Sequence, residues 1–130
     1  MFARRETVVS DGEVSSDDVT ARQAAEDVEQ RGATAHVLDG SDLVNKRTTL
    51  DGIAAVLSFP EWAGRNLDAL YDCLTDLSWL DEGEHVLIWS GHRNLAEHDP
   101  KAYRRINAVL KDAEHNPWCR RTFTSVLPRD

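Results

Sequence analysis

Three aspartates, Asp68, Asp72 and Asp76, follow one another at intervals of four residues in the middle of the chain. Residues four apart lie on the same face of an α-helix, so a helix here would carry the three carboxylates in one row. Tyr71 borders the row, and the opposite arc of the helix consists of Leu67, Leu70, Leu74 and Leu77. Carboxylates accept charge-assisted hydrogen bonds from Arg, Lys and His. The spacing therefore predicts an exposed acidic face that binds a cationic partner.

The acidic row works slightly against helix stability. Asp68 lies in the first turn, where the helix dipole favours an anion, but Asp72 and Asp76 have no Lys or Arg three or four residues away. Each like-charge pair at this spacing destabilises a helix by about a few tenths of a kcal/mol. A binding function would explain the row, although a charge run on an amphipathic helix is in most sequences only a solvated face.

The residues just before this helix favour the binding interpretation. Glu61 adds an acid, Trp62 adds a large aromatic side chain, and Gly64 leaves a position without a side chain. Aromatic side chains beside charges are frequent anchors of interfaces, although a single Trp is more often part of a core. Asn66 is well suited to cap the helix. The candidate site on this segment thus comprises Trp62, Gly64, Asn66, Asp68, Tyr71, Asp72 and Asp76.

The overall charge also indicates a cationic partner. The 130 residues have a formal net charge of -8, and residues 60–82 hold six acids against one base. Contact with a phosphate backbone requires clustered Lys and Arg, so the sequence predicts no direct binding to nucleic acid.

A chain of this length fits one domain.

Catalytic and metal sites have weaker signals. A pair of aspartates can hold Mg²⁺, but Asp68 and Asp72 have no third ligand at an obvious spacing. The chain contains no phosphate-binding Gly-rich loop, HExxH or GxSxG motif, and its five histidines are scattered. We therefore expect no catalytic residues, no cofactor and no metal, with a metal-dependent hydrolase as the less favoured alternative.

The sequence predicts a cytoplasmic protein with reduced thiols. No apolar leader segment follows Met1, and nowhere do about 18 apolar residues follow one another, so we expect neither export nor membrane insertion. Cys73 and Cys119 stand outside any CxxC or Cys/His spacing, and we expect both to be unpaired.

The elements that must position the acidic row alternate between helix and strand. We expect a flexible arm at 1–18, within which a short strand at 7–9 stays open, and then a single domain at 19–130. The expected elements are helices at 19–31, 50–58, 66–77 and from Pro100 to before Asn116, and strands at 34–38, 85–89 and 122–127. A capping box of Thr48 and Asp51 would begin the second helix. Strands separated by helices predict an α/β fold with a parallel sheet of about three strands packed with helices.

The segment from Phe59 to Leu74 resembles the central segment of barstar-like proteins. That family shows Pro, Glu, an aromatic pair and Gly, followed by Asn-Leu-Asp-Ala-Leu, an aromatic residue and Asp. The order of strands and helices over residues 33–128 is similar as well, whereas the arm and the first helix form an N-terminal extension outside the resemblance.

The resemblance implies an intracellular inhibitor of a ribonuclease of the barnase kind, a pair known for charge-steered association. In the family, an aromatic residue before Gly, two helix aspartates with an aromatic residue between them, and an acid on a late helix enter the active site of the enzyme. By position these correspond to Trp62, Asp68, Tyr71, Asp72 and Asp112. The carboxylates would act as phosphate mimics, and we expect the chain to act as a monomer.

The chain also departs from the family pattern. Ala63 replaces the second aromatic residue, Asp76 stands where the family can have Gly, and the loop at 81–84 is longer and more acidic. The expected partner is therefore a basic extracellular-type ribonuclease or toxin domain that differs from barnase. The alternative is an interaction or immunity domain of the same fold that binds a partner other than a ribonuclease.

Overall fold

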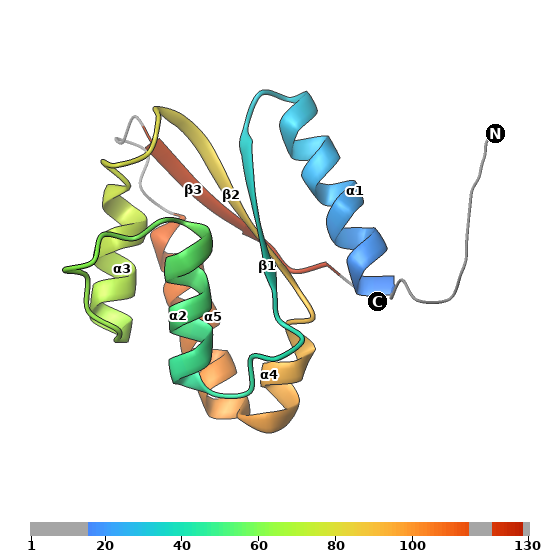
Figure 1. Ribbon diagram of the computed structural model, residues 1–130, viewed down its shortest axis with the longest axis vertical. Helices are drawn as coiled ribbons and strands as arrows, with labels where there is room; N and C mark the ends of the chain where they lie inside the picture. Colours follow the sequence, from blue (N-terminus) through green and yellow to red (C-terminus); the bar gives the residue numbers. More distant parts are fainter. Residues whose placement is uncertain (1–15, 115–120, 129–130) are drawn as a thin grey trace.

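A three-stranded parallel sheet lies at the centre of the computed structural model, which describes residues 16–114 and 121–128 (Figure 1). The strands are β1 (Thr34–Asp39), β2 (Gly83–Ser90) and β3 (Arg121–Val126), in the order β1-β2-β3. Thr34 pairs with His85 in the β1–β2 register, and Gly83 pairs with Arg121 in the β2–β3 register. The predicted α/β fold with a parallel sheet packed with helices is confirmed.

The central strand β2 is covered on both faces, as its continuous apolar run predicts. Its residues from His85 to Ser90 are all buried. Because successive side chains of a strand point to opposite faces, Leu87 and Trp89 belong to one core cluster and Val86 and Ile88 to another. Each face of the sheet therefore has its own hydrophobic core.

Three helices cover the face of Leu87 and Trp89. They are α2 (Lys46–Val56), α3 (Leu67–Asp76) and α5 (Pro100–Ala113), and they pack on the sheet and on one another (Figure 1). Fully buried side chains of these helices include Ile53, Leu74, Ile106 and Leu110. This larger core fixes the rotation of α3, which is the helix of the acidic row.

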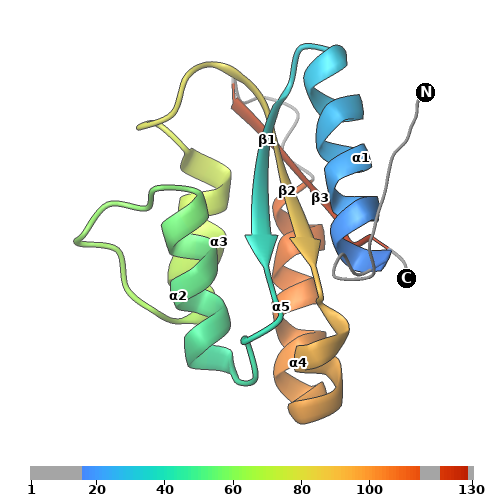
Figure 2. The same ribbon diagram turned by 45° about the vertical axis from the view of Figure 1, so that its right-hand side comes forward.

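Helix α1 (Ser16–Gln30) lies on the other face of the sheet (Figures 1 and 2). Its Ala21 and Val28 are buried against Val86 and Ile88. The predicted helix of the N-terminal extension is confirmed, but it begins at Ser16, so the last three residues of the expected arm belong to it. The rest of the arm, with its open strand at 7–9, lies outside the described residues.

Helix α2 begins four residues earlier than its apolar pattern predicts. Asn45 is the N-cap, because its side-chain oxygen accepts a hydrogen bond from the Thr48 amide at 2.8 Å, while the Asn45 amide donates to the Thr48 hydroxyl at 3.3 Å. The expected capping box of Thr48 with Asp51 is therefore wrong. Its apolar periodicity starts only at Leu50, one turn after the helix itself.

The short helix α4 (Arg93–His98) is missing from the expected elements. It follows Gly91, which has a φ of 65°, and it contributes one fully buried side chain, Leu95. The next helix, α5, begins as predicted, since the Asp99 carboxylate accepts a hydrogen bond from the Ala102 amide at 3.2 Å. It ends at Ala113, and the segment from 115 to 120, which includes Cys119, lies outside the described residues.

Candidate functional site

The acidic helix α3 is fixed at both ends and along its apolar side. Its N-cap is Asn66, whose side-chain oxygen accepts a hydrogen bond from the Ala69 amide at 2.8 Å. Its C-cap is Leu77, in the left-handed region at a φ of 52°. Leu70 and Leu74 are buried in the core, so the opposite side of the helix faces solvent.

The carboxylates of Asp68, Asp72 and Asp76 are exposed on that solvent-facing side. Asp76 accepts a hydrogen bond from the Ser78 hydroxyl at 3.0 Å. Among the residues that the structure describes, Asp68 and Asp72 have neither an ion pair nor a side-chain hydrogen bond. Two carboxylates of the row thus have all their acceptor capacity free.

The acidic row also acts on the thiol between its members. Cys73 is a free cysteine on the buried side of α3. Burial raises the pKa of the Cys73 thiol, and the negative charges of Asp72 and Asp76 raise it further. The neutral thiol is the favoured form at this buried position, because a thiolate would lose its hydration there.

Two aromatic side chains accompany the carboxylates on the surface. Trp62, in the loop between α2 and α3, has an exposed fraction of 78%, and Tyr71 on α3 has 43%. The alternative that Trp62 is a core residue is wrong. Exposure of the apolar surface of a large aromatic side chain to water is unfavourable. Exposed Trp side chains are therefore typical anchors of interfaces.

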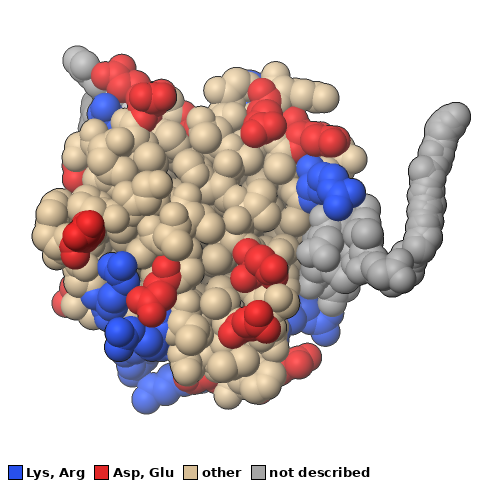
Figure 3. Space-filling view, viewed as in Figure 1, with Lys and Arg blue, Asp and Glu red and all other residues tan. Residues whose placement is uncertain are grey.

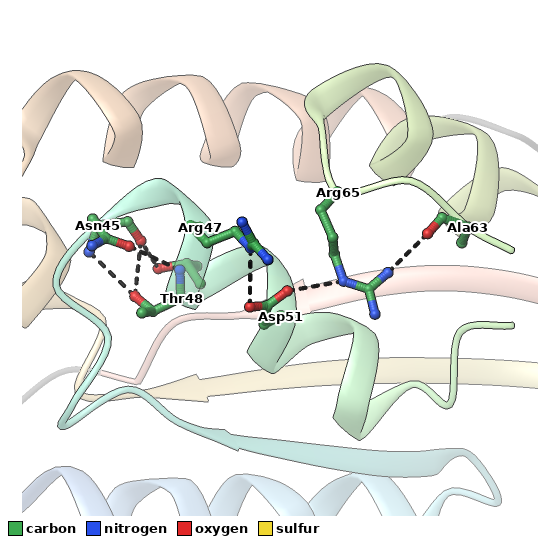
Figure 4. Close-up of polar contacts among 7 residues, drawn as sticks. Asn45, Arg47, Thr48, Asp51, Ala63 and Arg65 are labelled. Carbon is green, nitrogen blue, oxygen red and sulfur yellow. Dashed lines mark hydrogen bonds and ion pairs between the residues drawn. The ribbon is translucent and has the colours of Figure 1, made fainter. Parts of the chain in front are cut away.

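The loop that carries Trp62 is tied to α2 through Arg65 (Figure 4). Its Nε donates to the Asp51 carboxylate at 2.9 Å, and its Nη1 donates to the Ala63 carbonyl at 3.0 Å. Arg47 reaches the same carboxylate at 3.4 Å. The sequence analysis did not predict these residues as part of the site. The one available signal was that Arg65 is the single base within residues 60–82.

Gly64 lies at the end of this loop, against the cap of α3. A Cβ at Gly64 would lie 3.1 Å from the Asn66 side-chain nitrogen and 3.5 Å from the Ala69 Cβ. The first distance is shorter than an ordinary van der Waals contact. The absence of a side chain at Gly64 therefore lets the loop pass closely over the capping residue.

Asp112 is exposed on α5, the helix that packs beside α3. Within the described part of the chain, no hydrogen bond or ion pair connects Asp112 to the carboxylates of α3. The structure therefore places seven of the eight predicted site residues on one continuous segment, from Trp62 to Asp76, and the eighth on a neighbouring helix.

Acidic and basic side chains are distributed unevenly over the surface (Figure 3). Acidic side chains are spread over the face shown, and the largest group of Lys and Arg lies near its lower left margin, with others at its right and upper left margins. In the described residues, no group of three or more His, Cys, Asp or Glu side chains has a geometry that would hold a metal ion. None of the described helices has the length and apolar character needed to cross a membrane.

These features define a small α/β protein in which a helix with a core-facing leucine stripe presents a row of carboxylates beside an exposed Trp. A family model described as Barstar (barnase inhibitor) matches residues 33–126, from just before β1 to the end of β3. The chain belongs to the barstar family. Helix α1 precedes the matched region.

A similar protein is known from Bacillus subtilis (strain 168), where it is named "Putative ribonuclease inhibitor YrdF". The two sequences are 47% identical over 45 residues, which is 35% of this chain and 47% of the Bacillus protein. The matched segment thus spans about half the length of that relative.

Proposed function

We propose that this protein inhibits a ribonuclease by placing the exposed face of α3 and the adjoining loop in the enzyme's basic active site. One observation carries the proposal: Asp68 and Asp72 are exposed and have no partner among the described residues. Membership of the barstar family and the name of the Bacillus relative support it.

The chemistry is phosphate mimicry. A ribonuclease holds the phosphates of RNA with Arg, Lys and His, which form charge-assisted hydrogen bonds to oxygen anions. Two carboxylates with free acceptor capacity offer the same kind of ligand at fixed positions. Because a carboxylate has no phosphorus–oxygen bond to cleave, it occupies the site without turnover.

The proposed site has acidic, aromatic and positioning residues. Asp68 and Asp72 fill phosphate positions, while Asp76 and Asp112 extend the negative surface. Trp62 and Tyr71 supply the aromatic contacts of the interface. Asn66 and Gly64 act on the geometry, because Asn66 caps α3 and Gly64 lets the loop lie close to that cap.

The proposed partner is a basic extracellular-type ribonuclease or toxin domain, which a monomer of this protein would bind in the cytoplasm as an antitoxin or immunity protein. The domain would extend from the start of α1 to the end of the chain. Because the eight proposed residues come from one chain, no second copy is needed to complete the site. In this proposal the protein has no catalytic residues and requires no cofactor.

The test is capture of a partner by the purified chain, identified by mass spectrometry, followed by RNA hydrolysis assays with and without the chain. We expect a basic ribonuclease that the chain inhibits at a ratio of one to one. Specific capture of a partner without ribonuclease activity would favour the alternative of an interaction domain for another kind of protein. Turnover by the chain itself that disappears in Asp68→Ala and Asp72→Ala would contradict the proposal.

A further inference from the structure

The loop between α2 and α3 is anchored at both ends before it presents Trp62. At its start, the Phe59 amide donates to the Ala54 carbonyl at 2.9 Å. A turn follows, in which the Ala63 amide donates to the Pro60 carbonyl at 3.0 Å. At the end of the loop, Asn66 caps α3. Between these anchors, the position of Trp62 depends on the contacts of its immediate neighbours.

Arg65 supplies those contacts (Figure 4). One edge of its guanidinium group donates to Asp51 on α2, and another donates to the carbonyl of Ala63, the residue directly after Trp62. One side chain thus connects the loop backbone to a helix of the core. The side chain of Arg65 is 35% exposed, so its charge is partly withdrawn from solvent.

Asp51 is available for this contact because it is not used as a cap. Asn45 and Thr48 form the capping box of α2, and Asp51 lies one turn further along the helix. Arg47, one turn before it, holds the same carboxylate from the other side at 3.4 Å. Asp51 therefore lies between two guanidinium groups, of which only that of Arg65 belongs to the loop.

We propose that Asp51 and Arg65 form a positioning pair for the inhibitory site, an inference that rests on the proposed function. The pair does two things. It fixes the loop so that Trp62 is presented in one position before the partner arrives, which lowers the entropy lost on binding. It also turns the one cation of residues 60–82 toward α2, so that a basic partner does not meet it.

The pair is not expected to contribute much to the stability of the fold. Ion pairs with this degree of exposure add little, because water screens the charges and both side chains lose freedom. A change in binding or in loop motion without a change in thermal unfolding would therefore distinguish positioning from a general structural role.

The first experiment measures hydrogen exchange of the Ala63 amide by NMR in the free protein. We expect Asp51→Asn to exchange at least about threefold faster than wild type, because the loop opens more often without its tie to α2. Two variants serve as controls. Arg47→Gln removes the other guanidinium from Asp51 and leaves the contact between Asp51 and Arg65 in place. Glu26→Gln, at an exposed acid of α1, changes the net charge as Asp51→Asn does, but on the opposite face of the sheet. Equal exchange in wild type and Asp51→Asn would overturn the proposal.

The second experiment measures binding kinetics with barnase as the probe. We expect Asp51→Asn to weaken binding about three- to tenfold in the presence of Trp62, but less than about twofold in a Trp62→Ala background. Such coupling between two residues that share no hydrogen bond or ion pair would show that Asp51 acts through the position of Trp62. An equal loss in both backgrounds, or the same loss in Glu26→Gln, would contradict the positioning role.

Arg65→Gln separates the two effects of the pair. Both Asp51→Asn and Arg65→Gln should accelerate dissociation, because both release the loop. Only Asp51→Asn should slow association, because it leaves a free guanidinium near the acidic face. Equal association rates of the two variants would contradict the charge effect. If wild type fails to bind barnase, the proposed function fails for this nuclease, whereas hydrogen exchange still decides whether the pair fixes the loop.

Discussion

At the scale of single residues, the most informative side chain is that of Asp72. It lies between Asp68 and Asp76 on the exposed face of α3, and no described residue neutralises it. Replacing it with Ala removes like-charge repulsion at both i−4 and i+4, so the free energy of unfolding should stay unchanged or rise by about a few tenths of a kcal/mol. Binding to the ribonuclease should weaken on the order of several kcal/mol, mostly through faster dissociation, because cations of the enzyme stay buried and unpaired.

Thermal unfolding and binding kinetics on the same two proteins test this expectation. Asp42→Ala, which removes an exposed acid from the β1–α2 loop, is the charge-matched control and should inhibit nearly as well as wild type. If Asp72→Ala melts at a lower temperature and still inhibits as tightly as wild type, Asp72 is a structural residue.

A second residue-level prediction concerns Gly64. Substitution with Ala places a Cβ 3.1 Å from the Asn66 side-chain nitrogen, so the capping side chain must move by a few tenths of an ångström. Loss of a cap costs about 0.5–2 kcal/mol, and Gly64→Ala should lower the free energy of unfolding by part of this amount. Urea denaturation of Gly64→Ala, Asn66→Ala and the double variant is the measurement. If the two losses add fully, Gly64 does not act through the cap.

At the scale of secondary structure elements, two histidines connect the sheet to the segments around α3. The two rings contact each other, with the His36 Nε2 3.0 Å from the His85 Nδ1. Each ring also contacts a backbone carbonyl: the His36 Nδ1 lies 3.2 Å from that of Val56, and the His85 Nε2 lies 2.7 Å from that of Asp81. Carbonyls only accept, so a ring nitrogen that bonds one must carry a proton. The contact between the two rings needs one N–H and one bare nitrogen, so the two histidines can share a hydrogen bond while both are neutral.

This arrangement predicts a loss of stability at acidic pH. Burial lowers the pKa of His36, and the neighbouring His85 lowers it further. A folded pKa below the ordinary value of about 6.5 means that His36 contributes stability above that pH and loses it as the pH falls through its folded pKa. The physical reason is that a protonated His36 would lose hydration on burial and would lie beside His85.

The measurement is urea denaturation of wild type and His36→Leu between about pH 7 and pH 5, a window that begins just above the unfolded pKa of about 6.5 and extends below it. Wild type should lose stability more steeply than the variant, because carboxylate titration is common to both proteins. Parallel pH profiles of the two proteins would contradict the expected role of the histidine pair.

Helix α1 lies outside the region that matches the family, yet it packs against β1 and β2 on one face of the sheet. Val28 has an exposed fraction of 2% and packs with Val86 and Ile88. Val28→Ala should therefore lower the free energy of unfolding by about 1–3 kcal/mol, whereas the control Val44→Ala, at 38% exposure, should change it by less than about 0.5 kcal/mol. Inhibition below the melting temperature should not change, because α1 and α3 lie on opposite faces. Weaker inhibition by folded Val28→Ala would contradict that separation.

The elements differ in how well local sequence predicts them. Helix α3 and strand β2 have strong local signals, a leucine stripe with a capping Asn66 in one and an unbroken apolar run in the other. Helix α4 has six residues, one buried side chain and no side-chain cap, so its periodicity is too short to recognise.

The site also has one part that local sequence predicts and one part that it does not. The acidic row is a local pattern, whereas the orientation of Trp62 and the contact between Asp51 and Arg65 depend on how two helices pack.

At the scale of the whole molecule, the net charge of -8 acts over a longer range than any single contact. A basic ribonuclease that approaches the chain is attracted before any hydrogen bond forms, which raises the rate of association. The charge is uneven, since residues 60–82 hold six acids against one base, while the largest group of Lys and Arg in Figure 3 lies near the lower left margin. An uneven field also favours approaches in which the acidic face meets the enzyme.

This long-range attraction predicts a specific dependence on salt. Raising ionic strength from about 0.01 M to 1 M shortens the Debye length from about 30 Å to about 3 Å, which screens charges that are not yet in contact. Association with barnase, or with the captured ribonuclease, should therefore slow by about tenfold or more for wild type and Asp72→Ala alike. The ratio of their dissociation rates should change little, because the proposed contact of Asp72 would be short-range and shielded from water in the complex. Stopped-flow kinetics over a salt series measures both rates. An association rate that is independent of salt would show that the acidic surface does not steer the partner, and a ratio of dissociation rates that collapses toward one at high salt would place Asp72 outside the contact.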